Sequence, residues 1–451
     1  MDRNAPGISK GIDIWLIWLY LLLAGIGIMA VFAATYKEPD PMMASFFSFK
    51  TDYSKQLYYF LFAAVVGIFI LLTDSKFFTA TANIWYAVGI LVLLLVFPFG
   101  SKVKGTESIL RFGGIQFQPA EFCKVSVCLA LAKYLSLPNM DFSKTRSQLI
   151  AAGIALLPAI MSILQSETGL ALVYFSFFIV MYREGLPATI LVVGFSIGVL
   201  VVATLLVDSD VLAIALTVIT AIAGYFVYMM ARRKSGIIMK VVIVWIICVG
   251  IQRFGVPMIF KNVMQPYQVE RIYSTIGRDV PDEYKKGEQT ALVQKKKPNA
   301  KREETGVDYN VKQSKIAIGS GGITGKGLLK GTQTRYDFVP EQRTDFIFCT
   351  IGEGFGFVGT TTLLLIYLLL LFRMVTLAER QRSVFSRVYA YGVVSVFFFH
   401  IAINVMMTIG LAPVIGIPLP LISYGGTSLL TFTILIFILI RLDADRQMVL
   451  R

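Results

Sequence analysis

Long apolar runs recur along the whole chain, and they constrain its fold more than any other feature. Twelve runs of about 17 to 25 residues alternate with charged breaks, and this is the length at which a helix crosses a bilayer. Of the 451 residues, 56% are hydrophobic and only 16% are charged, whereas a water-soluble protein of this size needs more charge on its surface. The sequence therefore predicts an all-α polytopic membrane protein with about 10–12 transmembrane helices.

The runs give an expected order of membrane spans. They lie at 14–34, 56–73, 79–99, 119–136, 147–164, 167–183, 187–207, 211–231, 236–253, 349–373, 387–411 and 420–441. The break at 165–167 is so short that it fits either a tight hairpin or one broken helix. Lys and Arg gather in alternate short loops, which predicts cytoplasmic N- and C-termini. Retention of these Lys and Arg residues on the cytoplasmic side explains the net charge of +14 without a nucleic acid partner.

One break between spans is much longer than the others. Residues 254–345 form a loop that the alternation of basic loops places outside the cytoplasm, and long loops cross a membrane largely regardless of charge. Within it, 279–309 is polar and poor in aromatic residues, which predicts a flexible insertion. The expected domains are an N-terminal transmembrane bundle over 1–253, this large extracytoplasmic loop, and a C-terminal bundle over 346–451.

The loop ends in a charge cluster, RYDFVPEQRTDFIF, directly before an expected span. Charges this close to hydrocarbon are costly unless they are paired, solvated or used. Asp345 has a simple structural role as a carboxylate at a helix start, favoured by the helix dipole. It also fits a general base, which must be a carboxylate or histidine placed at the substrate. The spacing leaves both roles open.

A second charged motif, QPAEFCK, opens the fourth expected span. Pro119 suits the first turn of a helix, where its missing N–H is not needed. Glu121 and Lys124 lie three residues apart on one face, where they can pair. They are either a self-neutralised pair or the polar wall of a membrane-embedded cavity, and ionisable residues within a membrane favour the cavity. Arg111 adds a cation at the outer surface.

Glycines and lysines concentrate near the end of the large loop. The glycines at 319–322 and 325–327 could let backbone N–H groups approach an anion. The Walker pattern is absent, however, and a run of tight turns is the simpler interpretation. Lys315, Lys326 and Lys330 nearby favour docking of an anionic group.

The last expected span follows an irregular segment. Pro413, Pro418 and Pro420 with SYGGTS describe broken or re-entrant backbone, which membrane depth tolerates only beside protein or a watery cavity. His400, the only histidine, is expected to be an interior side chain, which argues against a His-based metal site or a Ser-His triad. The four cysteines lack metal-ligand spacing and are expected in the core.

Taken in order, these motifs resemble those of the SEDS family, the polymerases of bacterial cell-wall peptidoglycan. The residues that carry the resemblance are QPAEFCK, YNVKQSKIAIGSGG, GKGLLKGTQ, DFVPEQRTDFIF and PLPLISYGGTS. GKGLLKGTQ is similar to the elongation-type branch rather than the division-type branch. The resemblance implies a peptidoglycan glycosyltransferase in the bacterial cytoplasmic membrane, acting on lipid II at the extracytoplasmic face. Lipid II is a disaccharide-pentapeptide on undecaprenyl pyrophosphate.

The resemblance also implies residue roles and partners. The family's essential aspartate falls on Asp345, and its important Glu, Lys and Arg fall on Glu121, Lys124 and Arg111. The further residues expected to contact substrate are Arg271, Lys315, Lys326, Glu341 and Arg343. The implied protein partner is a class B penicillin-binding protein transpeptidase within the elongation machinery.

The chain departs from the family's pattern in three places. The family's QPDLG reads QSETG here, so Glu167 replaces an aspartate. A helix pair within 187–253 is additional, and the insertion at 279–309 is longer than usual.

Because the donor sugar of lipid II is α-linked and the polymer is β-1,4-linked, the expected transfer inverts the anomeric carbon and needs one base. Asp345 is expected to be that base, or else a ligand of Mg²⁺ or another divalent cation that also binds pyrophosphate. No organic cofactor is expected. A lipid II flippase also fits a polytopic chain with buried charges, and a non-catalytic scaffold is a third alternative. Charges concentrated at the outer face favour the polymerase over the flippase.

Overall fold

The structure, a computed structural model, describes residues 11–36, 46–103, 106–112, 115–165, 167–230, 235–264, 269, 273, 280–281, 284 and 306–446. These residues group into two compact units, Met1–Leu186 with Tyr309–Arg451 and Pro187–Asp308. This grouping differs from the division expected at residues 253 and 345. The helices after residue 187 pack on one another and on part of the large loop, and together they form the second unit.

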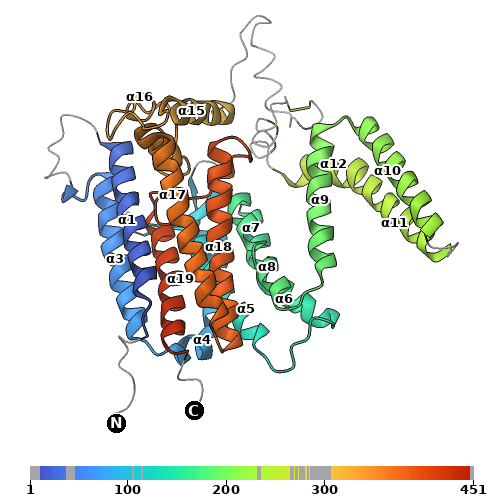
Figure 1. The fold of residues 1–451 in the computed structure, drawn as a ribbon, viewed down its shortest axis with the longest axis horizontal. Helices are drawn as coiled ribbons and strands as arrows, with labels where there is room; N and C mark the ends of the chain where they lie inside the picture. The colour runs from blue at the N-terminus through green and yellow to red at the C-terminus, as the bar shows by residue number, and fades with distance from the viewer. Residues whose placement is uncertain are drawn as a thin grey trace, which may run out of the picture. The chain divides into compact units, whose positions relative to one another are not determined.

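The first unit is a bundle of long helices with two short helices, α15 and α16, lying across one end (Figure 1). Its helices are α1 (Ile14–Thr35), α3 (Asp52–Leu72), α4 (Ser75–Phe99), α5 (Pro119–Leu135), α6 (Thr145–Leu164), α7 (Thr168–Tyr174), α8 (Phe177–Arg183), α15 (Gly306–Ser320), α16 (Thr332–Arg335), α17 (Ile347–Glu379), α18 (Val384–Thr408) and α19 (Gly426–Ala444). The end covered by α15 and α16 is called the outer end below, and the opposite end the inner end.

Ten helices of the described chain are long and apolar enough to cross a membrane, so the chain is a multi-pass membrane protein. The two expected spans outside this group form α5, with 17 residues, and the broken pair α7 and α8. Every expected span therefore corresponds to helical structure. The break near 165 is a hairpin, because α6 ends at Leu164 and α7 begins at Thr168 and packs back on α6.

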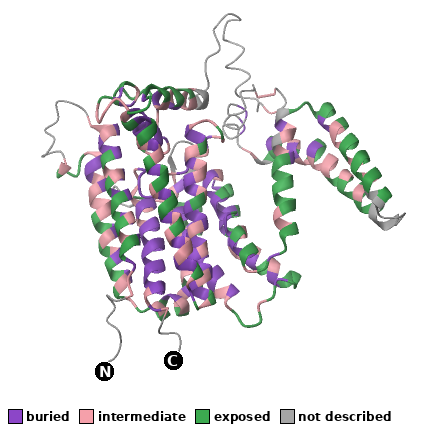
Figure 2. Ribbon diagram, viewed as in Figure 1, coloured by how far each residue is buried: buried purple, intermediate pink, exposed green. Residues whose placement is uncertain are grey.

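The centre of the first unit is formed by α5, α18 and α19. Helix α19 is buried from Thr431 to Asp443, and Figure 2 shows this continuous burial beside the mixed pattern of α1 and α3. A helix that is apolar on all sides can be buried on all sides. The peripheral helix α3 instead exposes large apolar side chains such as Phe62 and Ile68, which suits contact with lipid.

A small antiparallel sheet, which the all-α prediction omitted, joins α4 to α5. Its strands are β1 (Ser101–Val103), β2 (Thr106–Phe112) and β3 (Ile115–Phe117), and they lie in the order β1-β2-β3. In the β2–β3 pair, Arg111 lies opposite Gln116. Strands of three to seven residues within mainly polar loop sequence give too weak an alternation to be recognised from sequence alone.

The second unit contains the three helices expected between 187 and 253. They are α9 (Ala188–Leu206), α10 (Ser209–Met230) and α11 (Ser235–Gly250), and the chain continues through η2 (Ile251–Gly255), α12 (Val256–Met258) and η3 (Ile259–Val263). Leu205, Val256 and Phe260 form a core with Val269 and Tyr273 of the large loop. A hydrogen bond of 2.6 Å from the Gln252 amide to the Ser209 carbonyl further ties η2 to the start of α10.

The segment 409–425, between α18 and α19, has no regular secondary structure, as the re-entrant prediction requires. Its depth follows from Gly27 of α1, where an added Cβ would lie 2.5 Å from the Leu421 carbonyl oxygen. Gly27 lies eight residues before the end of α1 at Thr35, which corresponds to about 12 Å below the outer end. The re-entrant segment therefore passes directly against α1 within the membrane-spanning bundle.

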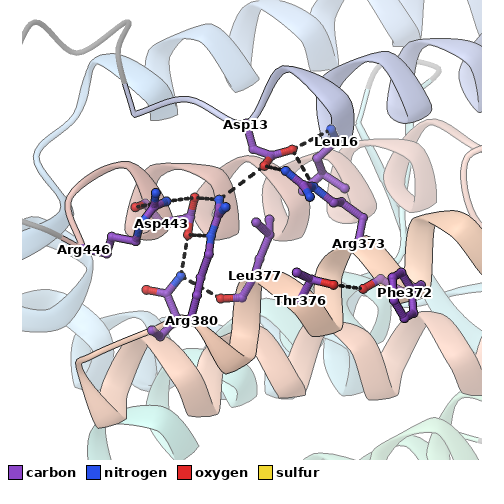
Figure 3. A network of polar contacts seen from close by, with 10 residues as sticks. Asp13, Leu16, Phe372, Arg373, Thr376, Leu377, Arg380, Asp443 and Arg446 are labelled. Carbon is purple, nitrogen blue, oxygen red and sulfur yellow. Dashed lines mark hydrogen bonds and ion pairs between the residues drawn. The ribbon is translucent and has the colours of Figure 1, made fainter.

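A charge network at the inner end joins the start of α1 to the ends of α17 and α19 (Figure 3). Asp13 is buried and accepts hydrogen bonds from Arg373 and Arg380, and Arg380 also binds Asp443. Burial alone would raise the pKa of Asp13, but the hydrogen bonds from Arg373 and from the Leu16 N–H hold this pKa below its ordinary value of 3.8. The network connects three helices that are far apart in sequence.

We predict that Asp13→Asn destabilises the protein by about 1.5–3 kcal/mol, because it removes charge-assisted hydrogen bonds from two arginines. The depressed pKa means that this stabilisation is complete above pH 3.8 and is lost as pH falls through the pKa of the folded protein. Thermal unfolding in detergent should therefore separate the variant from wild type at pH 7, and the difference should shrink as pH falls below 3.8 and through the pKa of Asp13 in the folded protein.

Glu379→Gln is the matched control, since Glu379 lies on the same helix but pairs with Arg183 at the surface. Exposed ion pairs contribute little to stability, so this control should unfold like wild type. An Asp13→Asn variant as stable as the control at pH 7 would contradict the prediction.

Candidate active site

Asp345 lies at the outer end of the first unit, in the turn just before α17. It is half-buried, and α17 begins at Ile347 with Phe346 at the N-cap position. The helix start expected at Thr344-Asp345 is thus two residues early. Because Asp345 precedes the first helical turn, its position depends on contacts beyond the helix itself.

Three successive backbone carbonyls around Asp345 are held by hydrogen bonds. The Tyr424 N–H donates to the Arg343 carbonyl at 2.9 Å, and the Ser423 hydroxyl donates to the Thr344 carbonyl at 2.6 Å. The Asn404 amide of α18 donates to the Asp345 carbonyl, also at 2.9 Å. The re-entrant segment and α18 therefore fix the backbone that carries the carboxylate.

The Asp345 carboxylate itself lies beside the re-entrant segment. A Cβ added at Gly416, which has a φ of 75°, would come within 3.4 Å of Asp345 Oδ2. Strained backbone is found on both sides of this contact, since Glu341 and Leu421 have φ values of 58° and 65°. Such conformations cost about 1–3 kcal/mol each and persist only where the surroundings fix them, often at functional sites.

Glu121 and Lys124 form a fully buried ion pair with a third member, His400 of α18. Lys124 Nζ lies 2.6 Å from Glu121 Oε2 and 2.7 Å from His400 Nε2, and all three side chains are at most 1% exposed. The ammonium also lies 5.3 Å from the centre of the Phe432 ring. The structure thus brings together Glu121 and Lys124 as expected, and adds the histidine. In this arrangement their charges face each other, and contact with substrate stays a prediction.

Arg343 and Arg111, expected to contact substrate, lie in different surroundings at the outer end. Arg343 pairs with Asp52 at the start of α3, and its guanidinium carbon lies 5.8 Å from the centre of the Tyr424 ring. Burial, with a smaller contribution from the Asp52 charge, raises the pKa of the Tyr424 phenol well above its ordinary value. Arg111 is exposed on β2.

Lys326, another expected substrate contact, is engaged by Glu353 of α17. Lys326 Nζ lies 2.8 Å from Glu353 Oε1, and the Glu353 side chain is fully buried. The same carboxylate accepts hydrogen bonds from the backbone N–H groups of Gln333 and Thr334 at 2.9 and 2.8 Å. Glu353 is therefore the anchor that holds the glycine-rich loop and α16 to α17.

The glycines of this loop serve close packing against a kink in α17. Gly356 departs from helical geometry with a φ of 64°, and the N–H groups of Phe357 and Val358 bond to the carbonyls of Gly322 and Ile323. In return, the N–H groups of Lys326 and Gly327 bond to carbonyls of α17 at 3.0 and 2.9 Å. These N–H groups are already used, so the tight-turn interpretation of the glycine run is supported over an anion cradle.

The remaining expected site residues are placed as follows. Lys315 is exposed on α15, and its side chain lies against Gly410 of the re-entrant segment. The Glu341 carboxylate accepts a hydrogen bond of 3.1 Å from the hydroxyl of Thr344, the residue directly before Asp345. Arg271 and most of the expected insertion at 279–309 lie outside the described residues.

Sequence reasoning did not single out Glu353 or Asp52. Glu353 stands in the apolar run IGEGFGFVG, and a charged residue inside an expected span is itself a signal of function or pairing. Asp52 carries no such signal, because a carboxylate in the first turn of a helix is common. Its partner, Arg343, lies 291 positions away in the sequence. Within the described ranges, no group of three or more His, Cys, Asp or Glu side chains is arranged to hold a metal ion.

Comparison with known proteins places the whole chain in one family. The model of the FtsW/RodA/SpoVE family, described as cell cycle protein, matches residues 14–216 and 209–448. A relative named peptidoglycan glycosyltransferase RodA, from Treponema pallidum, is 29% identical and aligns over 97% of this chain and 98% of its own length. Peptidoglycan glycosyltransferase MrdB of Escherichia coli is 28% identical over 80% of this chain and 78% of its own length.

Solved structures show the same fold. One match is a structure of a peptidoglycan synthase complex, described as showing structural coordination of polymerization and crosslinking. It has a TM-score of 0.63 and 22% identity, over 96% of this chain and 98% of that chain. The crystal structure of the rod shape determining protein RodA of Thermus thermophilus matches with a TM-score of 0.58 and 20% identity, over 96% of this chain and 97% of that one.

We predict that Glu353→Gln loosens the glycine-rich loop. The amide cannot form the ion pair with Lys326, and its NH₂ group cannot accept a hydrogen bond from the backbone of α16. Limited proteolysis with trypsin should therefore cleave after Lys326 and Lys330 several-fold faster than in wild type.

Thr360→Val is the control on the same helix, because the Thr360 hydroxyl bonds only to carbonyls of α17 itself, at Gly356 and Phe357. This control should be cleaved at the wild-type rate. Equal cleavage of Glu353→Gln and wild type would show that the carboxylate does not hold the loop.

Proposed function

The chain belongs to the FtsW/RodA/SpoVE family of cell cycle proteins, and we propose that it is a peptidoglycan glycosyltransferase that polymerises lipid II during cell elongation. Its relatives aligned over most of their length carry the names of peptidoglycan glycosyltransferases. The observation that supports the activity most directly is the position of Asp345, a half-buried carboxylate on a backbone fixed by three hydrogen bonds. A general base needs this kind of fixed placement.

The proposed orientation puts both termini in the cytoplasm and Asp345 outside. Basic residues gather at the inner end. Arg373 lies near the end of α17, Arg380 follows that helix directly, Arg387 lies in the first turn of α18, and Arg441 lies near the end of α19. Retention of positive charge on the cytoplasmic side favours this orientation. Lipid II would then meet Asp345 at the extracytoplasmic face of the bacterial cytoplasmic membrane.

In the proposed reaction, Asp345 removes the proton from the 4-hydroxyl of the acceptor sugar as its oxygen attacks the donor anomeric carbon. The new C1–O4 bond forms while the bond from C1 to the phosphate oxygen breaks, and undecaprenyl pyrophosphate leaves with the bonding electrons. One displacement inverts the α-linked donor into a β-1,4 linkage. The leaving group is weakly basic and needs charge stabilisation rather than an acid.

Arg111 and Lys315 are the best candidates for that charge stabilisation. Both are exposed, and within the described part of the chain neither forms an ion pair. Lys124, Lys326 and Arg343 are instead paired with Glu121, Glu353 and Asp52. We therefore assign the pyrophosphate to the first two cations.

A divalent cation at Asp345 is the alternative to the base. The described residues offer Asp345 no second and third carboxylate or histidine as ligands. Mg²⁺ commonly binds one or two carboxylates together with substrate phosphates, so it would have to arrive with the pyrophosphate. The role of general base needs only Asp345 itself, so it is the role that we propose for this carboxylate.

The proposed partner is a class B penicillin-binding protein transpeptidase of the elongation machinery. The peptidoglycan synthase complex with the same fold is described as coordinating polymerisation and crosslinking. The elongation role rests on the relatives named RodA and MrdB, which precede those named FtsW in similarity. GKGLLKGTQ agrees with this branch.

The distribution of buried charge favours the polymerase over a lipid II flippase. Within the described spans, Glu121, Lys124 and Glu353 lie near the outer end, and Arg441 and Asp443 lie near the inner end. A transporter needs polar groups along the depth of the bundle. The middle of this bundle is mainly apolar.

We predict that Asp345→Asn abolishes glycan polymerisation, because an amide cannot accept the proton of the 4-hydroxyl. The assay uses purified protein with its transpeptidase partner, labelled lipid II and moenomycin, and it measures moenomycin-resistant glycan chains. Titration with EDTA and Mg²⁺ in wild type separates a base from a metal ligand.

Asp208→Asn is the control, because Asp208 is an exposed carboxylate between α9 and α10, and this variant should keep wild-type activity. Binding to the partner should be unchanged in both variants. Full polymerisation by Asp345→Asn would overturn the assignment.

We further predict that Arg111→Ala raises the KM for lipid II about tenfold with a smaller change in kcat. The pyrophosphate is already charged in the bound donor, so the arginine contributes mainly to binding, and a hydrogen bond between charged groups contributes about 1.5–3 kcal/mol. Arg382→Ala, an exposed arginine at the inner end, should leave both constants unchanged. An unaltered KM in Arg111→Ala would exclude this contact with the donor.

A further inference from the structure

The strongest unassigned feature is the third member of the buried charge cluster. We propose that His400 is a positioning residue for Asp345, acting through a hydrogen bond to the re-entrant segment rather than through contact with substrate. The proposal rests on the glycosyltransferase function proposed above. It gives a role to the only histidine of the chain, which is fully buried and 55 residues from Asp345 in sequence.

The chemistry of the cluster determines which nitrogen of His400 carries the proton. Lys124, as an ammonium paired with Glu121, has three donors and no acceptor, so His400 Nε2 must accept its hydrogen bond. In a neutral imidazole, the other nitrogen then carries the hydrogen. His400 Nδ1 lies 3.1 Å from the Pro418 carbonyl oxygen and donates to it. The Glu121–Lys124 pair therefore fixes the tautomer that can hold Pro418.

The Pro418 carbonyl, which His400 holds, lies one residue after the Ile417 carbonyl, which is linked to Asp345 through Asn404. The Asn404 amide donates to the carbonyls of both Ile417 and Asp345, at 2.7 and 2.9 Å. The carbonyl of Pro420, three residues after Ile417, accepts a hydrogen bond from the Tyr367 hydroxyl of α17. Pro418 and Pro420 are thus held by α18 and α17, and Asn404 links the same segment to the Asp345 backbone.

This connection explains why a buried ion pair is present on α5. A buried pair by itself is weak support for stability, because desolvation offsets most of its attraction. Backbone carbonyls at membrane depth, however, need donors wherever the chain is not helical. The pair supplies a fixed histidine donor at a place where the re-entrant segment has none of its own.

Two conservative variants separate the two hydrogen bonds of His400. The side-chain amide of Asn can place a donor where Nδ1 lies but cannot reach Lys124, whereas Gln reaches toward Lys124 and loses the donor at Nδ1. We expect His400→Asn to keep kcat for lipid II polymerisation within about twofold of wild type. His400→Gln should lower kcat about tenfold or more with an unchanged KM, because small misplacements of a reacting group are costly.

A second measurement does not depend on activity. Backbone hydrogen exchange, followed by mass spectrometry, should show faster exchange over 415–425 and 343–346 in His400→Gln and wild-type protection in His400→Asn. Ser395→Ala is the control on α18, since the Ser395 hydroxyl bonds only to Gly392 of the same helix. It should match wild type in both measurements.

The outcomes are distinguishable from failure of the proposed function. If wild type with its partner forms no glycan from lipid II, the function itself fails. If wild type polymerises and His400→Gln equals it in kcat and exchange, only the positioning role fails. Equal loss of kcat in both variants, or failure of both to fold, also overturns the role, because it would show that the contact with Lys124 or packing alone matters.

Discussion

Satisfying the backbone of residues 409–425 is the constraint on which the candidate site depends. This segment is not helical, yet at the buried residues Leu421 and Ile422 it passes Gly27 about 12 Å below the outer end of α1, a depth at which irregular backbone needs partners in the protein or in a watery cavity. Its carbonyls are instead bound by side chains from the surrounding helices, among them His400, Asn404 and Tyr367. Because some of these bonds extend to residues 343–345, the same network fixes the backbone of Asp345.

Charge pairing is the second organising feature of the bundle. Glu121 neutralises Lys124, Glu353 neutralises Lys326, and Asp13 neutralises Arg373. The Glu353–Lys326 and Asp13–Arg373 pairs join separate segments, whereas Glu121 and Lys124 share α5 and reach α18 through the contact of Lys124 with His400. The pairs therefore set geometry as well as supplying attraction. Arg111 remains exposed at the outer end, and it is one of the two cations that we propose bind the pyrophosphate.

The helical spans could be predicted well because apolar length is a local property of the chain. All twelve expected spans are helical, and the re-entrant segment before α19 was predicted from its prolines and glycines. The pairing of Glu121 with Lys124 was also accessible, since residues three apart share a helix face. The small sheet and the grouping of α9 to α11 with part of the large loop were not predicted, because both depend on which segments meet.

The sequence by itself determined the class of protein, the positions of the spans and the motif that contains Asp345. Tertiary structure alone decided what each charged residue of those motifs contacts: Lys326 meets Glu353, Arg343 meets Asp52, and Lys124 meets His400. The physical reason is the range of the interactions. Hydrophobic length and helix spacing act within tens of residues, whereas these contacts join residues up to 291 positions apart, and only the packing of helices brings them together.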